Sequence, residues 1–424
     1  MKVYVSGNGC NNLRLDTMLT KHALGIAKQE LVTSPAEADL IIYSACGART
    51  DTEERSINEM RLLLSQKQPE ARFVLSGCLP NINSERIDAE FNGVSNTIEL
   101  VPGYELPEYL KILEAFNQAD QDRLSLKEPS GAYISDDEIA ERVKVRDMLN
   151  KVDPSAARYY ESTTPGILFG LEKEPPEQIV ISRGCYYRCS YCVIWKGRGP
   201  YESLPEVNIV EKIKGAESEG IVLTSDESGK YGLDLRPRSN LSQLVDNIIE
   251  IQPEHHFYLR NLEPSPLEDH GESLSRFADS GLLYHLCVPV QSGSPRILNL
   301  MRRNYDPVEV LDNLKKFREK GVLIETHIMV GFPGETIDDL GLSLQFIEEL
   351  EPDNVQVIPY TDRPGAPSTS MDGKITDDEV RNRIDSFRFL RAKIVKDRYT
   401  SLLPDSIPNK QELIDAIVHS LRTL

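Results

Sequence analysis

The sequence predicts an α/β protein with an N-terminal doubly wound parallel sheet, followed by a partial (β/α)6 barrel and a short helical tail. Its length of 424 residues exceeds what a single hydrophobic core usually supports. Apolar runs alternate with helical segments in two separate blocks, which is typical of parallel sheets. Between the blocks, residues 116–175 are charged and polar, and "LEKEPPEQ" interrupts any helix there.

The first block predicts a domain over residues 1–115. A segment with Ile57, Met60, Leu63 and Leu64 at helical spacing lies between its second and third apolar runs. The three runs, each read as a strand, are Val3–Val5, Leu40–Tyr43 and Phe73–Leu75. The βαβα order predicts the parallel sheet, and residues 116–175 are predicted to be a connector with some helix.

The second block, residues 176–370, predicts the partial barrel. Helical stretches such as "PVEVLDNLKKFREK" and "TIDDLGLSLQFIEEL" separate its strand-like runs. Six such runs are present: Ile179–Ile181, Gly220–Thr224, Phe257–Leu259, His285–Val290, Ile324–Val330 and Val355–Pro359. By analogy with the full barrel, the carboxyl ends of these strands face the active site. The tail, residues 371–424, contains one long helix after Thr376-Asp377 and a shorter one in "NKQELIDAIVHSL".

The composition and net charge of the chain limit the location and the partners that we expect for it. No apolar run is long enough for a membrane span, and "MKVYVSGNGC" does not resemble a signal peptide. We therefore expect a cytoplasmic protein without a membrane partner, whose seven cysteines serve metal or redox chemistry rather than disulfides. The net charge of −19, from 48 basic and 67 acidic residues, leaves little basic surface for nucleic acid.

Three of the cysteines are concentrated in "SRGCYYRCSYCVIW", directly after the first predicted barrel strand. Cys185, Cys189 and Cys192 have the spacing C-x3-C-x2-C, and no neighbouring residue offers a fourth thiolate or imidazole. A structural zinc site usually needs four ligands. Thiolates also hold iron–sulfur clusters, and three of them leave one iron of a cubane open to another ligand.

Three further cysteines each follow a predicted strand of the first block. Cys10 lies in "GNGCNN", Cys46 in "SACGART" and Cys78 in "SGCLPN". Taken singly, each is better explained as a buried, inert thiol. Ligands gather at the carboxyl ends of parallel strands, so all three together predict a second metal site. Cys287, within an apolar strand, is predicted to be core packing.

The C-x3-C-x2-C loop resembles that of the radical S-adenosylmethionine (SAM) superfamily. Over most of the chain the sequence resembles the methylthiotransferases of that superfamily, which modify tRNA adenosines or a ribosomal-protein aspartate. The three N-terminal cysteine loops match that family in order. Four further segments follow in order: "LTSDESGKYGLDL", "VPVQSGSPRILNLMRRNY", "IMVGFPGETIDDL" and "YTDRPGAPSTSM".

The resemblance implies an enzyme with two [4Fe–4S] clusters and SAM. Cys185, Cys189 and Cys192 would hold the cluster that cleaves one SAM to a 5′-deoxyadenosyl radical. Cys10, Cys46 and Cys78 would hold the auxiliary cluster, whose sulfur a second SAM methylates before transfer to a C–H bond of the substrate. An electron donor such as flavodoxin or ferredoxin is implied. The expected contacts to SAM or substrate are Tyr191, Glu227, Arg260, Gln291, Ser292, Gly331, Phe332, Pro333 and Gly334.

Other polar residues at strand ends have two interpretations. Asn261 and Glu263 follow the third barrel strand, where charged residues more often line a cavity than a core. Arg363 is either a carboxylate- or phosphate-binding residue or a solvated loop arginine. His327 stands where the family usually has an aspartate, and either a changed barrel charge or simple core packing explains it.

The sequence departs from the family at its C-terminus, which bears on the substrate. Members of the family typically end in a small β-barrel, the TRAM domain, whereas only helices are predicted after "YTDRPGAPSTSM". Together with the acidic charge, this favours a peptide, protein or small-molecule substrate. A tRNA adenosine 2-methylthiotransferase, acting on threonylcarbamoyl- or isopentenyl-adenosine, is the alternative. A non-catalytic iron–sulfur scaffold is a third possibility from another class.

Overall fold

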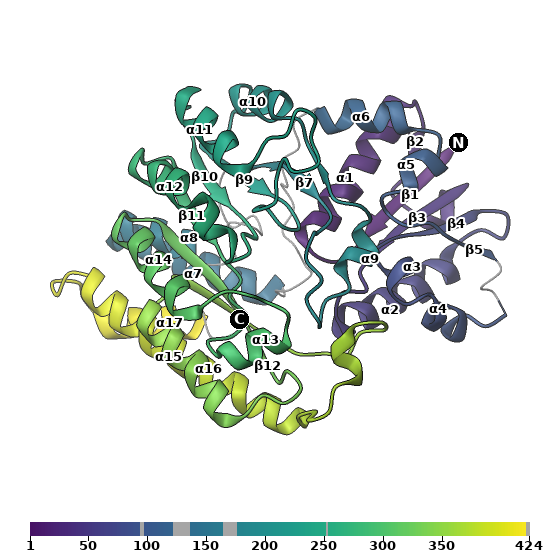
Figure 1. Cartoon of the computed structure of the whole chain (residues 1–424). Helices are drawn as coiled ribbons and strands as arrows, with labels where there is room; N and C mark the ends of the chain where they lie inside the picture. The colour runs from purple at the N-terminus through teal and green to yellow at the C-terminus, as the bar shows by residue number, and fades with distance from the viewer. Residues whose placement is uncertain (94–96, 122–135, 164–175, 252, 421–424) are drawn as a thin grey trace.

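The fold comes from a computed structural model that describes residues 1–93, 97–121, 136–163, 176–251 and 253–420. Two parallel sheets, one in each half of the chain, lie side by side with helices around them (Figure 1). The predicted α/β class, with a parallel sheet in each block and a helical tail, is confirmed. Among the described residues, no helix is both long enough and apolar enough to cross a membrane.

The N-terminal sheet has five parallel strands in the order β2-β1-β3-β4-β5. The three predicted strands form its centre, and the two that the sequence analysis missed are its short edges. The strands are β1 (Lys2–Gly7), β2 (Glu30–Leu31), β3 (Leu40–Ala45), β4 (Arg72–Gly77) and β5 (Ile98–Leu100). The helices are α1 (Asn11–Ile26), the 3-10 turn η1 (Pro35–Glu37), α2 (Thr50–Gln66), α3 (Leu79–Ile82), α4 (Ser84–Glu90), α5 (Leu106–Tyr109) and α6 (Leu113–Gln121).

Helices cover both faces of this sheet because its central strands are apolar on both sides. On one face, α2 packs Ile57, Met60 and Leu63 against the strands. On the other, α1 packs together with α5 and α6. Helix α6 begins before residue 115 and ends at Gln121, so the packing of this domain continues past the boundary expected from the sequence.

The second sheet has six parallel strands in the order β13-β12-β11-β10-β9-β6, as predicted for a partial barrel. Its strands are β6 (Glu177–Val180), β9 (Gly220–Thr224), β10 (His256–Leu259), β11 (Leu283–Cys287), β12 (Leu323–Val330) and β13 (Asn354–Pro359). The helices of this half are α9 (Ile194–Arg198), α10 (Glu206–Lys214), α11 (Leu241–Ile251), α12 (Pro266–Asp279), α13 (Pro295–Leu300), α14 (Pro307–Glu319) and α15 (Ile337–Leu350). A two-stranded antiparallel ribbon, β7 (Ser182–Arg183) with β8 (Glu202–Ser203), flanks the first cysteine loop.

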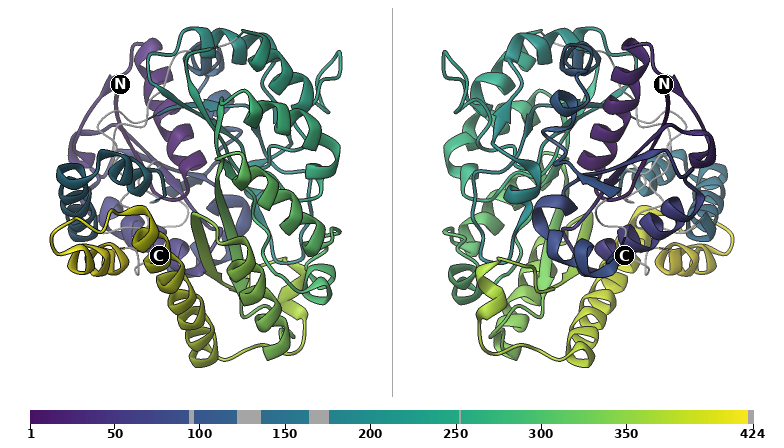
Figure 2. Two further views of the ribbon diagram at one scale, coloured as in Figure 1. Left: turned by 90° about the vertical axis from the view of Figure 1, so that its left-hand side faces the viewer. Right: turned by 90° about the vertical axis from the view of Figure 1, so that its right-hand side faces the viewer.

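The tail helices pack against the connector rather than standing alone. Helices α16 (Asp377–Leu402) and α17 (Lys410–Ser420) form a common apolar cluster with α7 (Asp136–Val152) and α8 (Pro154–Thr163). Figure 2 shows the blue-teal α7 and α8 beside the yellow end of the chain. The stretches 122–135 and 164–175 of the predicted connector lie outside the described residues.

The two halves meet where the cysteine loops are. Helix α9, which follows the C-x3-C-x2-C loop, packs against α3, which follows Cys78 (Figure 1). On the barrel side, Thr224 at the end of β9 donates a hydrogen bond to Asn12 of α1 (3.0 Å). The carboxyl ends of strands from both sheets therefore face one another across this contact.

Candidate functional site

The C-x3-C-x2-C loop runs between β7 and α9 and keeps its three thiols together. Burial, and then the neighbouring Cys189, raises the pKa of Cys192 to about 12. Burial, and then Cys192, also raises the pKa of Cys185. All three are free thiols. Cys185 and Cys192 are therefore costly to ionise unless a cation binds them, which is what an iron–sulfur cluster provides.

The three N-terminal cysteines follow neighbouring strands, because β1, β3 and β4 are adjacent in the sheet. Cys10 precedes α1, Cys46 follows β3, and Cys78 precedes α3. Burial, and then Cys46, raises the pKa of Cys10 to about 12, and the pKa of Cys78 responds to both other thiols. The close approach of Gly9 to Cys46 requires glycine, since a Cβ there would lie 2.7 Å from the Cys46 Cβ.

Arg198, the last residue of α9, joins the two domains. Its Nη1 donates to Asp16 of α1, and its Nε donates to Asp226 Oδ2 at 2.8 Å. Asp226, just past β9, also accepts hydrogen bonds from Asn12 Nδ2 (2.8 Å) and the Gly184 amide (2.9 Å). One buried ion-pair network thus connects α1 with the loop that carries the barrel cysteines.

The same network lies between the two groups of cysteines. Burial raises the pKa of Cys10 and of Cys78, the Arg198 charge lowers both, and the Asp226 charge raises both. Asp226 also raises the pKa of Cys192, so the two cysteine groups are neighbours across one ion pair. Sequence analysis missed both Arg198, six residues after Cys192, and Asp226, two residues after the end of β9. The available signal for Asp226 was its position at a strand end.

The backbones of the two domains also approach closely beside Cys78. A Cβ at Gly197 of α9 would lie 2.7 Å from the Cys78 Cβ and 3.0 Å from its Cα. Cys78 packs with Ile82, Val193 and Ala366 in a small apolar cluster. Glycine at position 197 is therefore required for the two cysteine loops to meet, and the apolar cluster shields Cys78 from water.

Arg303 also lies beside the cysteine loop, and the sequence analysis did not single it out. Its Nη1 donates to Tyr191 Oη at 3.2 Å and faces Cys189 Sγ at 3.9 Å, while its Nη2 lies 3.4 Å from Glu263 Oε1. Tyr191, the aromatic residue between the second and third cysteines, is thereby held against the cysteine loop. Arg303 also donates to the Pro289 carbonyl (2.8 Å), which anchors the loop to the end of β11.

Glu227 lies beside this loop and is 3% exposed, so it is a buried carboxyl group and not a surface one. Its two carboxylate oxygens accept hydrogen bonds from the amides of Gly229 (2.6 Å) and Lys230 (3.0 Å). Burial outweighs these hydrogen bonds and raises the pKa of Glu227 to about 7. Its charge in turn raises the pKa of Cys185, so Glu227 faces the barrel cysteines.

This shifted pKa makes a testable contribution to stability. An unfolded glutamate ionises near its ordinary pKa of 4.5, whereas folded Glu227 stays protonated up to about pH 7. Wild type should therefore lose about 3 kcal/mol of stability relative to Glu227→Gln as pH rises from about 4.5 to about 7. Thermal unfolding of both proteins under anaerobic conditions across this range measures the difference. A difference that does not change with pH would contradict the shift.

The "GFPG" turn lies next to the cysteine loop. Phe332 packs with Met301 and Met329 in an apolar cluster that Tyr191 also touches. The Gly331 amide donates to Glu335 (2.8 Å), and the Gly334 amide donates to the Gly373 carbonyl. The turn, which includes Pro333, therefore lies beside Tyr191 of the cysteine loop, and its glycines pack against the chain before and within α16.

Gln291 and Ser292 have different surroundings. The Gln291 backbone, at φ +69°, pairs with β12 through His327 and Met329, and its side-chain Oε1 is buried without a hydrogen-bond partner in the described structure. Ser292 Oγ contacts Ser343 Oγ (3.3 Å) and accepts from the Ser294 amide (3.1 Å). The side chain of Ser292 is therefore engaged in holding α15, whereas Gln291 retains an acceptor for a ligand.

The remaining candidates are engaged in buried contacts. Arg363 is 4% exposed and pairs with the carboxylate of Glu53 of α2, so it is not a solvated loop arginine; the carboxylate that it meets belongs to the chain itself. Arg260 pairs with Glu325 inside the barrel (3.1 Å). Asn261, at φ +56°, donates to the Ser225 carbonyl (2.6 Å). These residues hold the strand ends in place around the cysteine loops.

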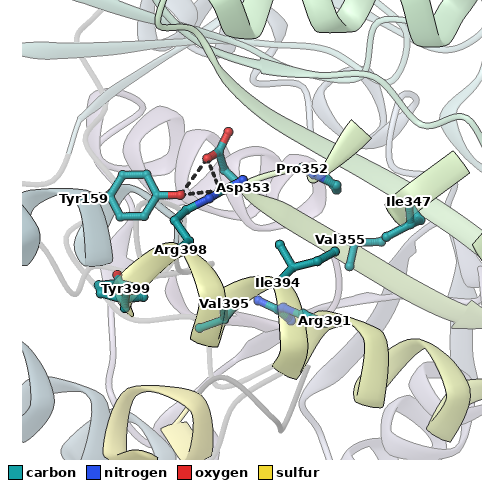
Figure 3. A pocket seen from close by; sticks show the side chains of 10 residues that line it. All are labelled: Tyr159, Ile347, Pro352, Asp353, Val355, Arg391, Ile394, Val395, Arg398 and Tyr399. Carbon is teal, nitrogen blue, oxygen red and sulfur yellow. Dashed lines mark hydrogen bonds and ion pairs between the residues drawn. The ribbon is translucent and has the colours of Figure 1, made fainter. Parts of the chain in front are cut away.

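A small cavity elsewhere does not belong to the cysteine site. It lies between β13 and α16, and Figure 3 shows the polar group on its wall: Asp353 accepts from Tyr159 (2.8 Å) and Arg398 (2.6 Å). The rest of its lining is largely apolar, including Val355 and Ile394. The carboxylate and both donors are already paired, so this cavity offers packing rather than chemistry.

Two family models match the chain. The model described as "Radical SAM superfamily" matches residues 179–347, which span β6 to α15. The model described as "Uncharacterized protein family UPF0004" matches residues 2–98, the N-terminal sheet with all three of its cysteine loops. Each match covers most of one parallel sheet: strand β13 and the tail lie outside the first, and the second ends at the start of β5.

Curated relatives match nearly the whole chain. A protein of Methanocaldococcus jannaschii named "Probable threonylcarbamoyladenosine tRNA methylthiotransferase" is 29% identical over 90% of this chain and 81% of its own length. One of the same name from Pyrococcus abyssi is 27% identical over 86% of this chain and 78% of its own. The "Ribosomal protein uS12 methylthiotransferase RimO" of Pelobacter propionicus is 25% identical over 95% and 84%.

Solved structures support the same fold at lower sequence identity. The radical SAM methyltransferase TsrM from Kitasatospora setae superposes with a TM-score of 0.56 at 15% identity, over 87% of this chain and 77% of that one. The cobalamin-dependent SAM radical enzyme OxsB superposes with a TM-score of 0.58 at 13% identity, over 99% and 70%. At these identities the similarity establishes the arrangement of the two domains and not their chemistry.

Proposed function

This chain belongs to the radical SAM methylthiotransferase family, and we propose that it inserts a methylthio group at an unactivated C–H bond of its substrate. The cofactors are two [4Fe–4S] clusters and SAM. The observation that carries the proposal is the meeting of two three-cysteine groups across the Arg198–Asp226 ion pair. A radical source and a sulfur source must lie close together for a short-lived substrate radical to capture sulfur.

The thiols of this chain fit both clusters. Six free cysteines form two groups of three, none of them in a disulfide, and thiolate is the usual ligand of iron in such clusters. Cys185, Cys189 and Cys192 would hold the cluster that binds SAM, and the three N-terminal cysteines would hold the other. When bound, the first supplies the electron that splits SAM and the second supplies the sulfur.

The residues around the thiols would orient and shield the reactants. Arg303 holds Tyr191 against the cysteine loop, and the apolar cluster of Phe332, Met301 and Met329 keeps water from that side. Glu227, buried and facing the barrel cysteines, is placed to accept a hydrogen bond from the amino group of SAM. The unpaired Oε1 of Gln291 offers a further acceptor at a strand end, where ligands of parallel sheets bind.

For the substrate, we propose a peptide or another molecule that is not tRNA. The net charge of −19 supports this, because tRNA binding draws on basic surface. The relatives divide between both classes, since two of those compared are named for threonylcarbamoyladenosine tRNA and one for ribosomal protein uS12. Filter binding with tRNA at moderate salt separates the two. Tight, salt-sensitive binding would favour the tRNA adenosine alternative.

The reaction is tested with anaerobically reconstituted protein, SAM and a strong reductant. We expect about eight irons per chain, formation of 5′-deoxyadenosine and S-adenosylhomocysteine, and a substrate whose mass rises by SCH3 in place of H. Mass spectrometry of peptide and tRNA fractions identifies the carrier. If both clusters are intact and SAM is not cleaved, the chain is a non-catalytic iron–sulfur scaffold and the proposal fails.

A further inference from the structure

A second group of potential metal ligands lies inside the barrel and includes no cysteine of the two cluster sites. Cys287 ends β11, and Glu325 and His327 lie on the neighbouring β12, where Cys287 and Glu325 are register partners. Glu325 and His327 are two residues apart and therefore point to the same face of the strand. Cys287 and Glu325 are buried and His327 is partly exposed.

The three side chains bring one sulfur, one nitrogen and one oxygen to a common point. Cys287 Sγ lies 3.7 Å from His327 Nε2, which lies 3.1 Å from Glu325 Oε1. All three atoms lie within 4.8 Å of one another. Zinc bonds of about 2.3 Å to sulfur and about 2.0 Å to nitrogen, at a tetrahedral angle, place sulfur and nitrogen about 3.5 Å apart. The observed spacing is thus that of a ligand set.

Hydrogen bonding alone accounts for this arrangement less well. His327 Nε2 carries at most one hydrogen, yet the atom faces both a sulfur and a carboxylate oxygen. A metal ion at the centre would take the lone pair of each ligand atom. Other side chains would then hold the Glu325 carboxylate in position for the metal ion. Arg260 lies 3.1 Å and His285 lies 3.4 Å from Oε2, and Gln356 donates a hydrogen bond to Oε1 (3.0 Å).

The nearby positive charges do not exclude a cation. Arg260, His285 and Arg391 of α16 are the basic groups that act on Glu325. Burial lowers the pKa of His327, but Cys287 and Glu325 outweigh it and raise that pKa to about 9. A metal ion binds thiolate and neutral imidazole. The negative charges of the thiolate and the Glu325 carboxylate would then balance the two charges of a divalent ion.

We propose that Cys287, Glu325 and His327 bind one zinc ion, with a fourth coordination position open on the side where His327 is exposed. A mixed sulfur, nitrogen and oxygen set suits zinc and does not suit magnesium or calcium, which take oxygen ligands. Three protein ligands with one open position are typical of zinc sites that take water or a substrate atom. The site is independent of the two cluster sites and of the methylthiotransferase reaction.

Zinc itself is the probe, added as one equivalent to the cluster-loaded protein after chelation of adventitious metal. We expect one zinc per chain beyond the iron, with protons released on binding. X-ray absorption at the zinc edge should show one sulfur at about 2.3 Å among nitrogen and oxygen ligands. That edge is not obscured by the iron clusters, and this readout does not depend on activity.

Two variants and one control locate the zinc. Cys287→Ser and His327→Phe should each weaken zinc binding at least about a hundredfold, while keeping the iron content of wild type as evidence of folding. His256→Gln alters an exposed histidine on β10, away from the trio, and should bind zinc as wild type does. Absence of zinc uptake by wild type, or equal uptake by wild type and Cys287→Ser, would overturn the proposal.

Discussion

Replacing Cys46 or Cys78 with alanine is expected to abolish the methylthiolated product while SAM cleavage remains measurable. The two cysteines lie at the ends of β3 and β4, across the domain contact from the C-x3-C-x2-C loop. Losing one of three ligands should release the auxiliary cluster, so iron should fall from about eight to about four per chain. The barrel cluster, held by its own loop, should persist and continue to yield 5′-deoxyadenosine.

The opposite variant and a control make this result specific. Cys189→Ala should abolish both SAM cleavage and product, while leaving the auxiliary iron in place. Cys287→Ser removes the one cysteine outside both groups and should retain all the iron. Iron analysis, deoxyadenosine quantification and product mass are the measurements. If Cys46→Ala retained about eight irons, the assignment of the N-terminal cysteines would be wrong.

Replacing Arg198 with methionine is expected to have the largest effect on stability. The side chain pairs with Asp16 of one domain and Asp226 of the other, and it is 8% exposed. Its loss leaves the buried Asp226 without the cation that it pairs with, whereas Asp16 keeps a longer contact of 3.4 Å with Arg183. Breaking a buried ion pair in this way typically costs about 3–5 kcal/mol, and denaturant-induced unfolding of the two proteins compares them.

This substitution should also act on the auxiliary cluster. The Arg198 charge lies close enough to lower the pKa of Cys10 and Cys78, so removing it should lower the cluster's reduction potential in an EPR titration. Arg198→Lys restores the positive charge, but a single ammonium group cannot pair with both carboxylates as the planar guanidinium does. This variant should therefore restore the reduction potential of the cluster more fully than the free energy of unfolding. Lys196→Met, on the same helix, is the matched control and should change neither. An Arg198→Met protein as stable as wild type would contradict the role of the ion pair.

Most of the fold was predictable because it follows from patterns of residues that are close together in the sequence. The strands of the barrel and the centre of the N-terminal sheet are apolar runs separated by helical spacing, and all nine were expected near where they occur. The strands β2 and β5 were missed because they contain only two and three residues. The domain boundary expected at residue 115 falls inside helix α6, which runs from Leu113 to Gln121. The apolar face of this helix can be recognised only from its packing on α1.

The candidate residues also divide into those that the sequence identified and those whose surroundings depend on residues distant in the sequence. Cys185, Cys189 and Cys192 are recognisable from spacing within eight positions, and Cys10, Cys46 and Cys78 from the strand that precedes each. Arg363 remained ambiguous because its partner Glu53 is 310 residues away in sequence. Cys287 was expected to be simple core packing; it is buried, but its neighbours include Glu325 and His327 from the adjacent strand.

Short-range pattern was therefore sufficient for the fold class, the family and the six cysteines, because strand alternation and ligand spacing are properties of contiguous residues. The environment of those cysteines arises only on folding. Arg198 meets Asp226 across 28 positions and Asp16 across 182, and no local pattern records such partners. Their low exposure, their charges and their place between the two thiol groups follow from how the two sheets pack. That packing brings the two groups of cysteines, proposed to hold the radical source and the sulfur source, to one domain contact.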